Sequence, residues 1–135
     1  MDVRVVSFTD HVLTTRTSLT PNTNIHNTAF AGSLYAIESL TAWGVLYLAL
    51  EQAGFDASII HARGTIEFDA PVREDIIAVS DFGGHEHIFD ELHNTGKARL
   101  SLTTRVFAAS QSTGQQNAAS QFEGLYVVRL NWPDR

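Results

Sequence analysis

The segment from Asn24 to Leu34 carries the residue types best suited to chemistry in this chain. It reads Asn-Ile-His-Asn-Thr-Ala-Phe-Ala-Gly-Ser-Leu and leads into an apolar run that ends near Leu50. A polar turn that delivers the chain to the start of a long helix leaves free backbone N–H groups pointing at one place, where a carbonyl oxygen can be polarised. This pattern predicts an acyl-transfer or acyl-binding site.

The side chains of this turn allow both a chemical and a structural interpretation. His26 could act as an acid, a base or a hydrogen-bond donor, because its ordinary pKa is close to neutrality. Most isolated histidines in loops do neither. Asn24 follows Pro21 and Asn22, and asparagine is a favoured turn residue whose side chain binds nearby backbone. Gly32 either lets a substrate approach the backbone closely or permits tight packing of the helix start.

The composition describes one ordinary domain spanning residues 1–135. Of the 135 residues, 44% are hydrophobic and 18% are charged, so the chain can bury a sizeable core. The net charge of −6 argues against nucleic acid as a partner. The absence of cysteine excludes disulfides, thiolate metal sites and cysteine nucleophiles. No signal pattern follows Met1, and a cytoplasmic location is expected.

The apolar run from Ala29 to Leu50 predicts the central helix of the domain. It approaches the length of a membrane span, but polar residues and glycines interrupt its first two-thirds, and no membrane association is expected. A helix that is apolar nearly all round is wrapped by protein on most sides. Gly54 should end it, with Phe55 making the apolar contact that accompanies a glycine C-cap.

Runs rich in β-branched residues predict strands on both sides of this helix. The expected strands are Val12 to Leu19, Ala57 to Phe68, Ile76 to Phe82, Ala98 to Ala108 and Phe122 to Leu130. A short helix is expected over Glu86 to His93, and a turn at Gly114. Short connections favour antiparallel pairing, and an antiparallel sheet that curls round one long apolar helix is the hot-dog arrangement.

Five segments resemble the thioesterase-like domain found at the C-terminus of YiiD-type proteins. These are Asn27 to Tyr35, Leu40 to Gly44, Phe68 to Val72, Gly96 to Leu102 and Phe122 to Val128. The likeness covers most of the chain. It implies an α+β hot-dog fold, in which a curved antiparallel sheet of five or more strands wraps around one long central helix. In that family the domain often follows an acetyltransferase domain. This chain is too short to contain one, so it looks like the stand-alone form.

The resemblance also implies where a thioester would lie. Hot-dog thioesterases bring the thioester carbonyl to the N-terminal end of the central helix, which here places the oxyanion at the backbone of Ala31 and Gly32. Asn24 falls where many relatives have an asparagine that orients the turn or a catalytic water. Many of these enzymes carry an Asp or Glu within the helix. The position that matches the Asp is Ser39, and the nearest carboxylate is Glu38.

Glu38 is the hardest of these residues to interpret. A shift of one position turns a helical side chain by roughly 100°, so Glu38 cannot simply inherit the role of the missing Asp. If its helical face is buried, the ionised form is disfavoured and the pKa is raised, which would suit a general base. The competing interpretation is a structural ion pair with Arg63 or Arg99.

Two further pairs of residues have side chains that could bind a ligand. Lys97 and Arg99 alternate on a predicted strand, so they share a face and are candidates for the phosphates of coenzyme A. His85 and His87 could share a metal if their segment is extended, but the geometry is ambiguous and no metal site is expected. No cofactor is expected either, since coenzyme A would enter as part of the substrate.

The leading hypothesis is a thioesterase that hydrolyses an acyl-CoA or acyl-carrier-protein thioester. In it, Glu38 with Asn24 or His26 positions the attacking water. The alternative is a hot-dog domain that binds acyl thioesters without turnover, and the serine at position 39 favours it. A dehydratase-like enzyme is less favoured, because His26 and Glu38 do not match that local pattern. An exposed edge strand predicts a homodimer or a dimer of dimers, with the site between protomers.

Overall fold

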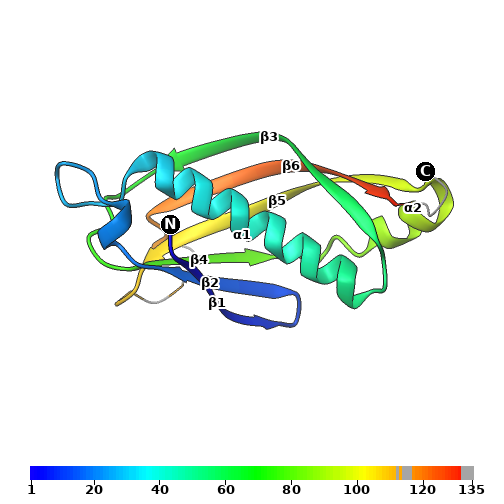
Figure 1. Ribbon diagram of the computed structural model, residues 1–135, viewed down its shortest axis with the longest axis horizontal. Coiled ribbons are helices and arrows are strands. Elements are labelled where there is room, and N and C mark those ends of the chain that lie inside the picture. Colours follow the sequence, from blue (N-terminus) through cyan, green and yellow to red (C-terminus); the bar gives the residue numbers. More distant parts are fainter. Residues whose placement is uncertain (112, 114–116, 132–135) are drawn as a thin grey trace.

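A computed structural model describes residues 1–111, 113 and 117–131, which form one antiparallel sheet and two helices (Figure 1). In chain order the elements are β1 (Val3–Thr9), β2 (Val12–Thr17), the 3-10 turn η1 (Thr20–Asn22), α1 (Ala31–Gln52), β3 (Ala57–Phe68), β4 (Ile76–Asp81), α2 (His87–Thr95), β5 (Lys97–Ala108) and β6 (Ser120–Leu130). The strand order is β1-β2-β4-β5-β6-β3, and α1 lies along one face of the sheet. The predicted α+β fold class is confirmed. The turn predicted at Gly114 lies outside the described residues.

The strands follow from the alternation of side chains that the sequence shows. Along the first half of β5, Ala98, Leu100 and Leu102 are buried while the residues between them are exposed. Strand β1 was absent from the expected strands. Within the part of the chain that the structure describes it pairs with β2 alone, through a turn in which Asp10 and His11 have positive φ, and a register shift near Val5 breaks its period of two.

The ends of α1 are set by the backbone. Phe30 is still extended, so the helix begins at Ala31 rather than at the predicted Ala29. At the other end Gly54 has a φ of +85°, and the N–H of Phe55 donates to the carbonyl of Leu50 at 2.9 Å. This is the predicted glycine C-cap, and it is confirmed.

The length and apolar composition of α1 would suffice to cross a membrane, but the helix is the core element of this fold. Its buried positions include Ile37, Val45 and Leu46, none of which exposes any surface. The helix contacts strands β2 to β6. Its hydropathy is therefore explained by packing within the protein.

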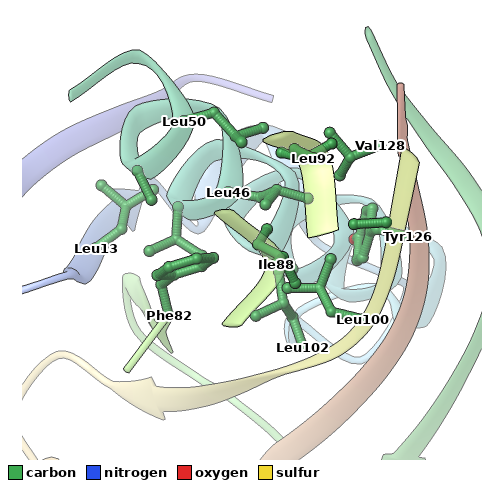
Figure 2. Close-up of a cluster of buried hydrophobic side chains, with 14 of the residues drawn as sticks. Leu13, Leu46, Leu50, Phe82, Ile88, Leu92, Leu100, Leu102, Tyr126 and Val128 are labelled. Carbon is green, nitrogen blue, oxygen red and sulfur yellow. The ribbon is translucent and has the colours of Figure 1, made fainter. Parts of the chain in front are cut away.

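The core divides into two clusters along α1. Under its C-terminal half, Leu46 and Leu50 pack with large side chains from the sheet and with Ile88 and Leu92 of α2 (Figure 2). Under its N-terminal half the cluster is built largely from smaller residues. Its buried members are Ala29, Leu34, Ile37, Val72, Ile76, Ala78, Val106, Ala108 and Ala119. The candidate site described below lies beside this second cluster.

Candidate active site

A pocket of about 300 Å³ opens beside the start of α1. Its walls come from the loop that precedes α1, from the first turn of α1 and from the segment that leaves β3. The lining residues are Asn24, Ala29, Ala31, Leu34, Phe68, Asp69, Ala70, Pro71 and Val72. The turn that the sequence predicted as an acyl site therefore borders a cavity. The sequence placed residues 68–72 at the end of a predicted strand and in the family resemblance, but gave no sign that they form a wall of the pocket.

The first turn of α1 borders this pocket through Ala31 and Leu34, while Gly32 is not among the lining residues. Within the described residues no side chain caps the helix, and its first turn contains no acidic residue. The N–H of Phe30 donates to the Asn22 carbonyl at 2.7 Å, whereas Ala31, Gly32 and Ser33 supply the first N–H groups of the helix, which have no partner within it. Ala31 and Gly32 are exposed. The positive end of the helix dipole there favours an anion or a developing oxyanion.

Gly32 has a packing role that the structure makes visible. A Cβ at this position would lie 2.5 Å from Cε2 of Phe30, so the missing side chain makes room for the Phe30 ring. That ring is half-exposed and lies next to the uncapped N–H groups. The packing interpretation of Gly32 is thus supported, and close approach by a substrate would require the Phe30 ring to move.

The Asn24 side chain organises the loop that forms one wall of the pocket. Its Oδ1 accepts hydrogen bonds from the backbone N–H of His26 at 2.8 Å and of Thr28 at 3.2 Å. Its Nδ2 donates to the Thr28 hydroxyl at 2.8 Å. Each of these contacts closes the loop on itself. His26 is exposed and is not among the residues that line the pocket, so the structure brings Asn24 but not His26 to it.

Asn24→Ala should lower the free energy of unfolding by about 1–2 kcal/mol, because it removes three hydrogen bonds from a partly buried turn. His26→Ala is the matched control from the same loop. It keeps the backbone N–H that Asn24 binds, and should change stability by less than about 0.5 kcal/mol. Urea unfolding measures both. Equal losses in the two variants would contradict the structural role of Asn24.

Glu38 is a fully buried carboxylate held by one hydroxyl. None of its surface is exposed, and the Ser120 hydroxyl donates to its Oε2 at 2.8 Å. Its Oε1 has no hydrogen-bond partner among the described residues. Burial raises the pKa of Glu38 to about 8, while the hydrogen bond from Ser120 acts in the opposite direction. The predicted rise of this pKa is confirmed.

The ion pair suggested for Glu38 is not formed. Arg63 and Arg99 are both exposed, and within residues 1–111, 113 and 117–131 no cation lies within ion-pair distance of Glu38. The hydroxyl of Ser120 takes the place that the sequence analysis had assigned to an arginine. This partner could not have been found from spacing, because the two residues are 82 positions apart in the chain.

Glu38 lies close to the pocket without lining it. Leu34, one helical turn earlier on the same face of α1, is part of the wall. On the sheet side, Ser120 follows Ala119, whose carbonyl accepts hydrogen bonds from the N–H groups of Asp69 and Ala70 at 2.8 and 3.0 Å. Both of these residues also line the pocket. Glu38 is therefore one helical turn from a wall residue of α1, and Ser120 is next to the residue that binds the wall segment of Asp69 and Ala70.

Ser39, at the position of the usual Asp, has a local role. Its hydroxyl donates to the carbonyl of Ala36 at 3.1 Å, and its own carbonyl accepts a hydrogen bond from the Tyr126 hydroxyl at 3.0 Å. Both contacts tie this part of α1 to its surroundings. Because its hydroxyl binds the Ala36 carbonyl and Ser39 is not among the residues that line the pocket, its side chain has no part in the pocket.

The two basic candidates lie at the other end of the sheet. Lys97 and Arg99 are exposed near the start of β5. Ala98 between them packs in the cluster that surrounds Leu50, at the C-terminal half of α1. In Figure 1 the start of β5, next to α2, lies at the opposite end of the sheet from the start of α1, where the pocket opens.

The two histidines at the start of α2 differ in exposure: His85 is half-buried and His87 is exposed. His87 lies 3.8 Å from Glu91 within α2, and Glu86 lies 3.6 Å from His11 in the β1–β2 turn. Among the residues that the structure describes, no group of three His, Asp or Glu side chains could hold a metal ion. These residues carry no part of the site.

Comparison with known proteins identifies the family and the fold of this chain. Residues 1–130 match the model of a family described as "Putative thioesterase (yiiD_Cterm)". The structure is similar to that of a "putative thioesterase" from Shewanella oneidensis, with 31% identity, a TM-score of 0.84, and coverage of 97% of this chain and 85% of that chain. A protein of unknown function from Chlorobaculum tepidum gives 27% identity and a TM-score of 0.90, over 97% of this chain and 84% of that one. A "Probable Thioesterase" from Pseudomonas aeruginosa shares the fold at 21% identity and a TM-score of 0.71, over 96% and 83% of the two chains.

Proposed function

The chain belongs to the family of YiiD-type C-terminal thioesterase domains, and on that premise we propose that it hydrolyses an acyl thioester of coenzyme A or of acyl carrier protein. The observation that carries this proposal is the pocket of about 300 Å³ at the uncapped start of α1. A carbonyl seated there would accept hydrogen bonds from backbone N–H groups that nothing else in the described chain uses. We expect the reaction to take place in the cytoplasm.

In the proposed reaction, Ala31 and Gly32 stabilise the negative charge that develops on the carbonyl oxygen. A water oxygen forms a bond to the carbonyl carbon while one of its protons passes to Oε1 of Glu38. Collapse of the tetrahedral intermediate breaks the C–S bond. The thiolate leaves with that bond's electron pair and recovers the proton from Glu38. No cofactor takes part, since coenzyme A is a portion of the substrate.

This reaction requires a local movement and an ionised base. Glu38 exposes no surface and Leu34 lines the pocket, so the Leu34 side chain must move aside for water to reach Oε1. Because the pKa of Glu38 is about 8, the fraction of enzyme with the base ionised rises as the pH approaches and passes that value. The rate of thiol release should rise over the same range.

The alternative function is acyl-thioester binding without turnover. Two observations favour it: Glu38 is enclosed, and Ser39 replaces the usual acid with a hydroxyl committed to the Ala36 carbonyl. Free-thiol release from a series of acyl-CoAs of increasing chain length, combined with calorimetric titration of the same compounds, separates the two functions. Thiol release supports hydrolysis, and saturable binding without thiol release supports the alternative.

Gly32→Ala should weaken substrate binding without weakening the fold. Alanine favours a helix over glycine by up to about 1 kcal/mol, and the atoms that a Cβ would meet belong to the movable Phe30 ring. We expect an unchanged or higher free energy of unfolding and a KM for acyl-CoA raised several fold, because the ring shifts over the N–H groups. A destabilised variant with a normal KM would assign Gly32 to packing alone.

We also propose a homodimer, or a dimer of dimers, built on the free edge of β3. Among the described residues this strand pairs with β6 alone, and α1, which contacts β3, carries an exposed apolar stripe. The residues of that stripe are Leu40, Trp43 and Tyr47. Antiparallel pairing of two β3 edges would reverse the second copy. The end of the sheet that carries Lys97 and Arg99 in one protomer would then lie at the same end of the assembly as the other protomer's pocket.

This arrangement predicts a particle of at least twice the mass of the chain. Sedimentation equilibrium measures that mass. If the protein is a monomer at micromolar concentration, the proposal of a site shared between protomers is wrong. Lys97 and Arg99 could then not contact the phosphates of a coenzyme A bound in the pocket.

A further inference from the structure

The contact between Ser120 and Glu38 joins two elements that are distant in the sequence. Ser120 is the first residue of β6, and Glu38 lies in the N-terminal half of α1. Neither side chain has exposed surface, and the distance from Oγ to Oε2 is 2.8 Å. A hydrogen bond to a carboxylate that water does not reach is stronger than its surface counterpart. It fixes the rotation of the carboxylate plane.

The two oxygens of this carboxylate are therefore unequal. Oε2 is held by Ser120, while Oε1 has no partner in the part of the chain that the structure describes. Leaving a buried acceptor unpaired is costly, and such atoms in native proteins call for an explanation in terms of function or strain. The free oxygen is the one available to exchange a proton.

Among the described residues, no charged side chain acts on Glu38 from the elements around it. Strands β2, β4 and β5 turn apolar side chains and hydroxyls toward α1. The Tyr126 hydroxyl donates to the carbonyl of Ser39, next to Glu38, and the Tyr126 ring packs against His61 of β3. His61 and Tyr35 both pack against Phe122. Besides burial, the hydroxyl of Ser120 is the influence that sets the acidity of Glu38.

We propose that Ser120 is the positioning residue of Glu38: by binding Oε2, it leaves Oε1 as the oxygen that takes the proton from the attacking water. This inference rests on the proposed hydrolase function and adds to it a residue from the sheet. Ser120 does not touch the substrate. It acts through Glu38, by orienting the carboxylate and by stabilising its ionised form.

Ser120→Ala tests the proposal through the pH profile of thiol release. Loss of a hydrogen bond to the ionised carboxylate should move the midpoint of kcat against pH upward by roughly one pH unit. The rate at pH 7 should then fall about tenfold, with most of it recovered on the alkaline plateau and KM little changed. Ser120→Thr keeps a hydroxyl and should restore the midpoint. An unchanged midpoint in Ser120→Ala, whatever the rate, would overturn the proposal.

Thr104→Val provides the matched control. Thr104 is also fully buried on the inner face of the sheet, but its Oγ1 has no hydrogen-bond partner among the described residues. Removing this hydroxyl should leave the midpoint where it is in the wild type. An equal shift in Thr104→Val would mean that any change of core polarity moves the pKa of Glu38, and the proposal would fail.

A second readout does not depend on activity. Carboxyl-carbon NMR of protein labelled at glutamate follows the titration of Glu38 directly, and its midpoint in Ser120→Ala should lie above that of the wild type. If the NMR midpoint moves while wild type and variants release no thiol, Ser120 does position Glu38 but the hydrolase function is wrong. If thiol is released and neither midpoint moves, the function stands and the role of Ser120 falls.

Discussion

Glu38→Gln should lower the rate of thiol release by about 10²- to 10⁴-fold, the usual contribution of a general base. Glutamine retains the shape of the side chain and an acceptor for the Ser120 hydroxyl, which donates to Glu38 at 2.8 Å. It cannot take a proton from water. The loss should therefore appear in kcat, while KM and the circular dichroism spectrum remain close to those of the wild type.

The neighbouring Ser39 supplies the control for this experiment. Ser39→Ala removes a hydroxyl whose contact is the backbone of its own helix, so it should retain most of the activity. Measured together, the two variants separate the residue proposed as the base from the position where related enzymes carry their acid. Near-normal thiol release by Glu38→Gln would remove Glu38 from the mechanism, and a large loss in Ser39→Ala would shift attention to position 39.

The stability of the wild type should fall as the pH rises through the range in which only the unfolded chain ionises Glu38. The pKa of this group is raised from its usual value of 4.5 to about 8 in the folded protein. Below pH 4.5 the residue is protonated in both states and costs nothing. Between the two values the unfolded state loses a proton that the folded state keeps, so unfolding becomes progressively easier. The full effect, reached above pH 8, is of the order of 5 kcal/mol.

Urea unfolding at about pH 5 and about pH 9, carried out on wild type and Glu38→Gln, measures this dependence. Relative to the wild type, the variant should gain more than about 2 kcal/mol between the lower and the higher pH, since it has no proton to lose. Glu67→Gln, which changes an exposed carboxylate on β3, should follow the wild type. Parallel curves for wild type and Glu38→Gln would show that the carboxylate is not buried in solution as it is in the structure.

Much of the architecture could be predicted because it depends on local patterns. Neighbouring residues in the sequence determine each of three features: the alternation along β5, the apolar run of α1 and the glycine C-cap at Gly54. Strand β1 could not be predicted with the same ease. Its bulge near Val5 interrupts the alternation, and only its pairing with β2 defines it.

The candidate site divides in the same way. The turn that leads into α1 was visible in the sequence, whereas the burial of the face that carries Glu38 entered the sequence analysis only as a condition. The partner of Glu38 was not visible, because a pairing between α1 and β6 depends on how the whole sheet wraps the helix. The sequence offered Arg63 or Arg99 as one alternative partner, because buried carboxylates are usually paired with a charge, whereas a serine hydroxyl gives no such signal.

The first turn of α1 is proposed to bind the thioester carbonyl, and the position of that carbonyl in a complex is the decisive measurement. A crystal structure with a non-hydrolysable thioether or ketone analogue of an acyl-CoA would locate it. The account predicts the carbonyl, or the oxygen that replaces it, within hydrogen-bond distance of the backbone nitrogens of Ala31 or Gly32, with the acyl group in the pocket lined by Leu34 and Phe68. An analogue bound elsewhere, with its carbonyl away from the first turn of α1, would contradict this proposal.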